Sequence, residues 1–152
     1  MEMDKGKVNM SGNRGPAPHK DPWVNVARGY VTNAVASLAA GGLYVEQNWL
    51  DPCDPRDATM VFCHPASSVS TEKHALVWDE VSGWRRGVFE SGHQGERTVL
   101  SSVSYLGGGV LLEGSELLGR LLAGASEPRQ EYRSVTDLHD GLDDALLRRN
   151  EI

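Results

Sequence analysis

Residues 74–89, with the sequence HALVWDEVSGWRRGVF, carry the signal that decides the fold. Two runs rich in β-branched and aromatic residues flank the polar segment Asp79–Gly83. Glycine adopts positive φ at little cost, so Gly83 can close a short loop between two strands. Trp78 and Trp84 stand on either side of the loop, where aromatic side chains contact each other across neighbouring strands. The pattern predicts a β-hairpin at the centre of a small antiparallel sheet.

One helix is predicted before this hairpin and one after it. Asp21-Pro22 is typical of a helix start, because aspartate accepts hydrogen bonds from free N–H groups and proline is tolerated in the first turn. Apolar residues then recur at three- and four-residue intervals until Gly41-Gly42, which ends the helix. A second, leucine-rich helix is expected between Ser115, its predicted N-cap, and Gly124.

Three further strands are predicted from short apolar or alternating runs. They cover residues 43–49, 59–63 and 98–105. In the first of them, Leu43, Val45 and Trp49 are expected on one face, with Gln47 as an exception to the alternation. Loops are expected at 51–57, 64–73 and 91–96, where proline, glycine and charged residues gather.

The element order predicts a two-layer α+β domain: an N-terminal helix, an antiparallel sheet of four to five strands, and a C-terminal helix. The helices are expected to cover one face of the sheet, and the other face is expected to be solvated or paired with a second copy. We assign residues 1–20 to a disordered arm, 21–125 to the domain and 126–152 to an acidic tail. The tail is interpreted either as frayed or as a short helix that docks on a partner or on its own domain.

Composition limits the classes of partner. The chain has 152 residues and a net charge of −6, which argues against non-specific nucleic-acid binding. Its longest apolar stretch, Ala34–Ala40, is too short to cross a bilayer, and no secretory signal is recognised at the start. We therefore expect a cytoplasmic protein without a nucleic-acid or membrane partner, whose two cysteines, Cys53 and Cys63, are free thiols.

Parts of the chain resemble a known family. The tryptophan-flanked turn 76–84, the glycine-containing run 105–110 and the segment 28–31 resemble an uncharacterised family of small actinobacterial proteins, catalogued as a domain of unknown function. The resemblance spans roughly residues 24–124. Family members tend to have prolines where this chain has 111–114, which moves the expected start of the second helix by about a turn. The resemblance implies the α+β architecture and supplies no activity, substrate or partner.

Motifs for metal binding and catalysis are weak. The metal-capable side chains of Cys53, Cys63, His64 and His74 lack the close ligand pairs of structural zinc sites, so we predict no metal and no cofactor. Gly107–Gly109 is not followed by the lysine and serine or threonine of a phosphate-binding loop. A nucleophile elbow is absent as well. The sequence leans away from an enzyme.

Binding is the function class that the sequence favours. Tryptophan and arginine are enriched at interaction hot spots, and a guanidinium can stack on indole. The candidate binding residues are Tyr30, Trp49, His74, Trp78, Trp84 and Arg86. In the alternative interpretation, these aromatic residues form the core and the arginines are solvated.

Two functions follow from these candidates. The first is a non-catalytic protein-binding adaptor or regulatory module, with another protein or a second copy as its partner. The second is a small-molecule-binding protein or enzyme, with a pocket between the sheet and the first helix.

Overall fold

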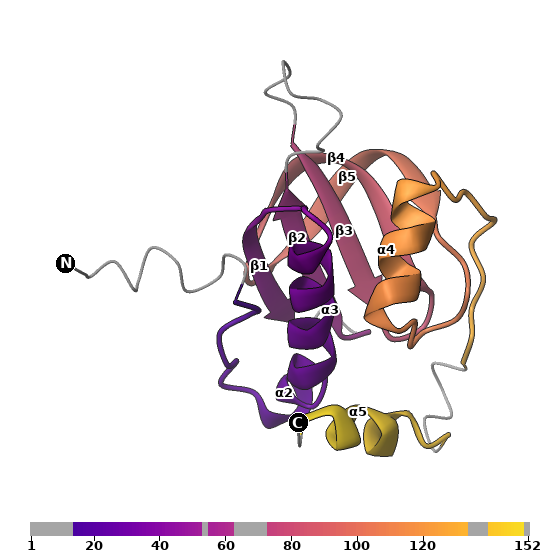
Figure 1. Ribbon diagram of the computed structural model, residues 1–152. Coiled ribbons are helices and arrows are strands. Elements are labelled where there is room, and N and C mark those ends of the chain that lie inside the picture. The colour runs from indigo at the N-terminus through magenta and orange to yellow at the C-terminus, as the bar shows by residue number, and fades with distance from the viewer. Residues whose placement is uncertain (1–13, 53–54, 63–72, 134–139, 151–152) are drawn as a thin grey trace.

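Five antiparallel strands follow one another in chain order across a single sheet, with α3 and α4 on one face (Figure 1). The structure, a computed structural model, describes residues 14–52, 55–62, 73–133 and 140–150. The strands are β1 (Val45–Asp51), β2 (Asp57–Phe62), β3 (His74–Asp79), β4 (Gly83–His93) and β5 (Glu96–Tyr105). The helices are α2 (Pro22–Asn25), α3 (Arg28–Ala40), α4 (Gly114–Leu122) and α5 (Leu142–Asn150). The predicted α+β class and its element order are confirmed.

The central hairpin forms as the sequence predicts. β3 pairs with β4 so that Trp78 lies opposite Trp84 and Asp79 lies opposite Gly83, whose φ is +78°. The Asp79 carboxylate accepts hydrogen bonds from the backbone N–H groups of Val81 at 2.8 Å and Ser82 at 2.6 Å. An aspartate that bonds the backbone two or three residues further on stabilises a tight turn, so Asp79 and Gly83 together fix this loop.

Replacing Gly83 tests how closely the turn is packed. We expect Gly83→Ala to lower the free energy of unfolding by about 2 kcal/mol or more, because a side chain at positive φ is strained. The new Cβ would also lie 2.5 Å from the carbonyl oxygen of Gly109. Gly95→Ala is the matched control, since Gly95 has a φ of +92° but no heavy atom within 4 Å of the added Cβ. Urea unfolding of both variants measures the difference, and equal losses would contradict a role for the Gly109 contact.

The first helix is divided, which the sequence pattern did not show. The Asp21 side chain caps α2 by accepting from the N–H of Trp23 at 2.9 Å, as predicted. α2 then ends at Asn25, whose side chain binds the backbone of His19 instead of facing solvent. Such side-chain-to-backbone bonds compete with regular helix. Apolar spacing continues across the break, so periodicity predicted one helix where there are two.

A β-bulge overturns the predicted faces of the first strand. The pairing of β1 with β2 shifts register between Val45 and Gln47, which reverses the alternation of side chains beyond that point. Val45 therefore packs with the helices, whereas Trp49 lies on the opposite face with Val61. The exception noted at Gln47 was the sign of this bulge.

The main core fills the space between the sheet and the helices. It combines the buried face of α3 with apolar side chains of the strands, and Leu117 and Leu121 of α4 close one side of it. Helix α4 begins at Gly114 after an N-cap at Glu113, so the predicted cap at Ser115 was wrong by two residues. Leu142 and Leu146 of α5 belong to the same core, which places this helix of the predicted tail region against α3.

The far face of the sheet, opposite the helices, is covered in part by the chain itself. β4 and β5 are longer than predicted, and their turn at 94–95 folds back towards β1. There the N–H of Gly95 donates to the Asp51 carboxylate at 2.7 Å, and the hydroxyls of Thr59 and Thr98 lie 2.7 Å apart. A small second core lies beneath this hairpin, formed by Trp49, Val61, Ala75, Phe89 and Leu100. The expectation that this face is solvated or covered by a second copy is wrong over this area.

Candidate functional site

Three of the predicted binding residues meet in the main core. The Tyr30 ring lies 5.8 Å from that of Trp78 and 6.2 Å from that of Trp84, measured between centroids. The Tyr30 hydroxyl accepts from the Trp84 indole N–H at 3.0 Å and donates to the Leu112 carbonyl at 2.7 Å. The Trp78 indole N–H donates to the Val110 carbonyl at 2.8 Å. All three side chains are buried, so they fill the space where a pocket between the sheet and the first helix was predicted.

The other three predicted residues lie apart from this cluster. Trp49 contacts Phe89 on the far face, with ring centroids 6.4 Å apart. His74 stacks on Phe62, and Arg86 is half-buried on β4 opposite Leu76. The structure therefore does not bring the six residues together, and their role in binding stays a prediction.

Three of the four possible metal ligands, Cys53, Cys63 and His64, lie outside the described residues. Within the described ranges, no three histidine, cysteine, aspartate or glutamate side chains gather closely enough to hold a metal ion.

A polar cavity of about 230 Å³ opens on the far face, between the ends of several strands. It is lined by Pro55, Asp57, Asp79, Arg85, Arg97, Tyr105 and Arg129. Asp57 precedes Ala58 and Asp79 follows Trp78, and these two apolar residues belong to the main core. Because neighbouring residues of a strand point to opposite faces, both aspartates point away from the helices.

Strand register places three aspartates in one row across the sheet. Asp57 of β2 pairs with Asp51 of β1 on one side and with Asp79 of β3 on the other. Asp51 accepts from the Gly95 N–H, while Asp79 accepts from its own turn and from Arg85 at 3.1 Å. Asp57, only 7% exposed, lies in the middle of this row and lines the cavity. Burial of a carboxylate disfavours its ionised form.

The pKa of Asp57 lies near neutral pH. Burial is the main cause that raises the pKa of Asp57 to about 7, and the charges of Asp51 and Asp79 add to it. Arg85 and Arg97 act in the opposite direction. Burial also raises the pKa of Asp51. A carboxyl group that gains or loses a proton near pH 7 is a feature of functional sites more often than of packed cores.

Cationic side chains form the other part of the cavity wall. Arg85 comes from β4, Arg97 from β5, and Arg129 from the segment 125–133 that follows α4. Guanidinium groups present several N–H donors in one plane, which suits oxygen-rich ligands. The described lining contains no serine, cysteine, lysine or histidine. The arrangement can recognise a charged group and exchange a proton with it.

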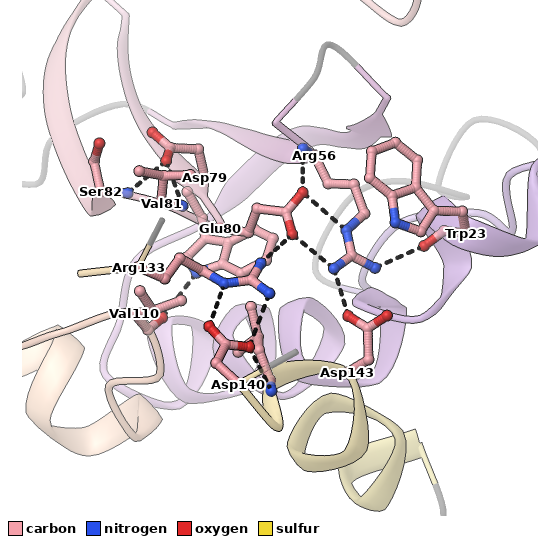
Figure 2. A network of polar contacts seen from close by, with 12 residues as sticks. Trp23, Arg56, Asp79, Glu80, Val81, Ser82, Val110, Arg133, Asp140 and Asp143 are labelled. Atoms are coloured by element: carbon pink, nitrogen blue, oxygen red, sulfur yellow. Dashed lines mark hydrogen bonds and ion pairs between the residues drawn. The ribbon is translucent and has the colours of Figure 1, made fainter. Parts of the chain in front are cut away.

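A second polar feature is a buried ion-pair network that joins distant parts of the chain (Figure 2). The Glu80 carboxylate, in the hairpin turn, binds Arg56 through two guanidinium nitrogens at 2.7 and 3.0 Å, and Arg133 at 2.5 Å. The side chains of Arg56 and Glu80 are each 2% exposed, and that of Arg133 is 4% exposed. Arg56 continues to Asp143 of α5 at 2.6 Å, and Arg133 to Asp140 at 2.7 Å.

This network holds the segment 125–133 beside the cavity. Arg133 is fixed to Glu80, and the Tyr132 N–H donates to the Val81 carbonyl at 2.8 Å. Further back, the Glu127 N–H donates to the Tyr105 carbonyl at 2.8 Å. Arg129 lies between these two attachment points and lines the cavity. Sequence reasoning missed both the network and the cavity, because their members are far apart in the chain and form no spaced motif.

A five-stranded antiparallel sheet, with helices on one face and a charged cavity on the other, defines a small α+β protein. The chain belongs to the family of unknown function DUF6292, whose model matches residues 30–123. This confirms the resemblance to an uncharacterised family. The match includes the cavity residues from Asp57 to Tyr105, whereas Arg129 lies beyond it.

Further comparisons add no relative. No curated protein and no solved structure matches the chain. None of the helices in the described ranges combines the length and the apolar character needed to cross a bilayer.

Proposed function

We propose that this chain is a non-catalytic binding protein whose ligand occupies the charged cavity around Asp57, Arg85 and Arg97. The observation that supports the proposal is the Asp57 carboxyl group, which is buried in the cavity wall between Asp51 and Asp79 and is influenced by the charges of Arg85 and Arg97. Such a group destabilises the fold when it is ionised, so a structural role does not explain it. A ligand can stabilise the Asp57 carboxyl group in two ways: it can donate a hydrogen bond to the carboxylate, or it can favour the protonated form.

The proposal takes up the small-molecule function that the sequence offered as the alternative to a protein-binding adaptor, and it places the binding site elsewhere. Tyr30, Trp78 and Trp84 occupy the predicted site between the sheet and the first helix. The cavity on the far face offers what that site lacks, namely open volume and several converging polar groups.

A protein-binding module is our second proposal. Its support is the pair of exposed apolar side chains Tyr44 and Leu122. Leu118 of α4 lies against the end of α3 at Gly41, and Leu122 follows one turn later in the same helix. Sedimentation of the purified chain tests for self-association, and a monomer at all concentrations would contradict a second copy as the partner.

We propose a cytoplasmic protein of an actinobacterium that binds neither nucleic acid nor membranes. The net charge of −6 supports the absence of a nucleic-acid partner.

Amide chemical shifts of isotope-labelled protein test the binding site directly. The probes are an anion, a cation and a neutral molecule, added at matched ionic strength as sodium sulfate, methylammonium chloride and glucose. We expect at least one probe to move the amide signals of Asp57, Arg85 and Arg97 while those of the outer face of α3 stay in place. If no probe moves the cavity signals, the proposed function is wrong.

A further inference from the structure

We infer that the cavity is an oxyanion site, which binds a small anion of the sulfate, phosphate or carboxylate class and takes up a proton at Asp57 when the anion binds. This inference rests on the proposed function and adds the ligand class and its coupling to pH. Guanidinium groups line the cavity, and Asp57 lies in the same wall.

The distribution of charge favours an anion over a cation. Arg85, Arg97 and Arg129 approach the cavity from three different parts of the chain. Of the two aspartates in the lining, Asp79 is already engaged by Arg85 and by two backbone N–H groups. When Asp57 is protonated, the lining holds three guanidinium groups and the single carboxylate of Asp79. Outside the lining, Arg129 also pairs with Glu131 at 3.2 Å, and Asp51 lies beside Asp57 in the sheet. The lining itself keeps a positive balance, which disfavours a cation. Guanidinium–oxyanion hydrogen bonds are charge-assisted and short.

The size of the cavity fits a small ligand. Its volume of about 230 Å³ is far above what a single water needs, roughly 10–15 Å³. A tetrahedral oxyanion or a short carboxylic acid can enter together with some of its hydration water.

Asp57 faces charges from every neighbouring strand. These are Asp51 from β1, Asp79 from β3, Arg85 from β4 and Arg97 from β5. Asp51 is in turn influenced by His19 and His93. An anion in the cavity would add a negative charge beside Asp57, which disfavours its ionised form and raises its pKa further. The protonated carboxyl group could also donate its O–H to the anion.

The direction of the pH dependence follows from this coupling. In the empty cavity Asp57 has a pKa of about 7, so it is mostly ionised above that pH. Because the bound state holds the proton more tightly, binding weakens as pH rises through this range. If the pKa rises by one unit or more, the Kd for the anion should increase about fivefold or more between about pH 6 and pH 8.5.

Calorimetric titration with sodium sulfate tests the inference. Sulfate is fully ionised across this pH range, so a pH dependence belongs to the protein. The titrations are made at constant ionic strength in two buffers of different ionisation enthalpy, which reports the protons taken up. Titrations with inorganic phosphate and acetate then distinguish a tetrahedral oxyanion from a carboxylate.

Matched variants separate Asp57 from other titrating groups. Asp57→Asn imitates the protonated form, so we expect it to bind sulfate as tightly as the wild type does at low pH, with no proton uptake. Asp144→Asn, an exposed aspartate of α5, should keep the wild-type pH dependence. Arg97→Gln should weaken sulfate binding at every pH, whereas Arg148→Gln on the exposed side of α5 should not.

The outcomes distinguish this inference from the proposed function. Sulfate binding that does not vary with pH, or that varies equally in Asp57→Asn, would overturn proton uptake at Asp57. If methylammonium or glucose moves the cavity amides and sulfate does not, the oxyanion class is wrong while the proposed function stands. If none of the probes acts there, both are wrong.

Discussion

Glu80→Gln is expected to lower the free energy of unfolding by about 3–5 kcal/mol, since it breaks a buried ion pair by removing one charge. The substitution leaves the guanidinium groups of Arg56 and Arg133 in place, with exposed fractions of 2% and 4%. A neutral amide offers one acceptor oxygen where the carboxylate accepts from Arg56 and Arg133 through both oxygens. Arg56 and Arg133 then keep only Asp143 and Asp140 as counter-ions, and both of these carboxylates are more exposed than Glu80. The two buried guanidinium charges are left poorly compensated, which is more costly than the lost attraction.

Urea denaturation at neutral pH measures this loss, and an exposed ion pair provides the control. Glu116 and Arg120 are one turn apart in α4 with a separation of 3.3 Å, and both side chains reach solvent. Glu116→Gln should cost less than about 1 kcal/mol. Hydrogen exchange gives a second readout, because Glu80→Gln should also reduce the protection of the Tyr132 amide and of α5. Equal costs for the two variants would show that burial of the network contributes nothing.

The parts of the fold that the sequence predicts correctly are those with local causes. The turn at Gly83 follows from a glycine beside polar residues, and the cap at Asp21 from an aspartate followed by proline. Both features arise within a few residues of chain. The tryptophans that flank the turn were predicted for the same reason. Their residue type alone, however, could not distinguish a binding surface from a packed core. Burial of Trp78 and Trp84 favours the core interpretation for these two residues.

The candidate site could not be predicted in the same way, because it depends on register and on contacts between distant residues. Asp51, Asp57 and Asp79 become neighbours only through the pairing of three strands. In sequence, Asp57 is merely the last residue of a proline-containing loop. Arg133 is 53 positions from Glu80. A bulge in β1 and the fold-back of the β4–β5 hairpin shape the far face, and alternation patterns report neither.

Asp57→Asn is expected to stabilise the unliganded protein, by about 2–4 kcal/mol at about pH 8. In the folded chain the pKa of Asp57 is raised from 3.8 to about 7, mainly by burial. The folded state therefore binds the proton more tightly than the unfolded state does. Above the folded pKa, both states have lost the proton and the fold carries the full penalty of a buried charge. Below about pH 4 both states are protonated, and the penalty disappears. The lower part of the range allows for incomplete hydrogen bonding of the buried amide.

Unfolding free energies at several pH values between about 4 and 8 test this sign. The advantage of Asp57→Asn should be close to zero at the acid end, grow as pH rises and level off above the folded pKa. Asp144→Asn in α5 should show no such growth, because that side chain is exposed. An advantage that is constant across pH would mean that Asp57 is not desolvated as the structure indicates. Suppose that Asp57→Asn is more stable than the wild type and that its affinity for sulfate no longer depends on pH. The Asp57 carboxyl group then lowers the stability of the protein, and its role in ligand binding accounts for that cost.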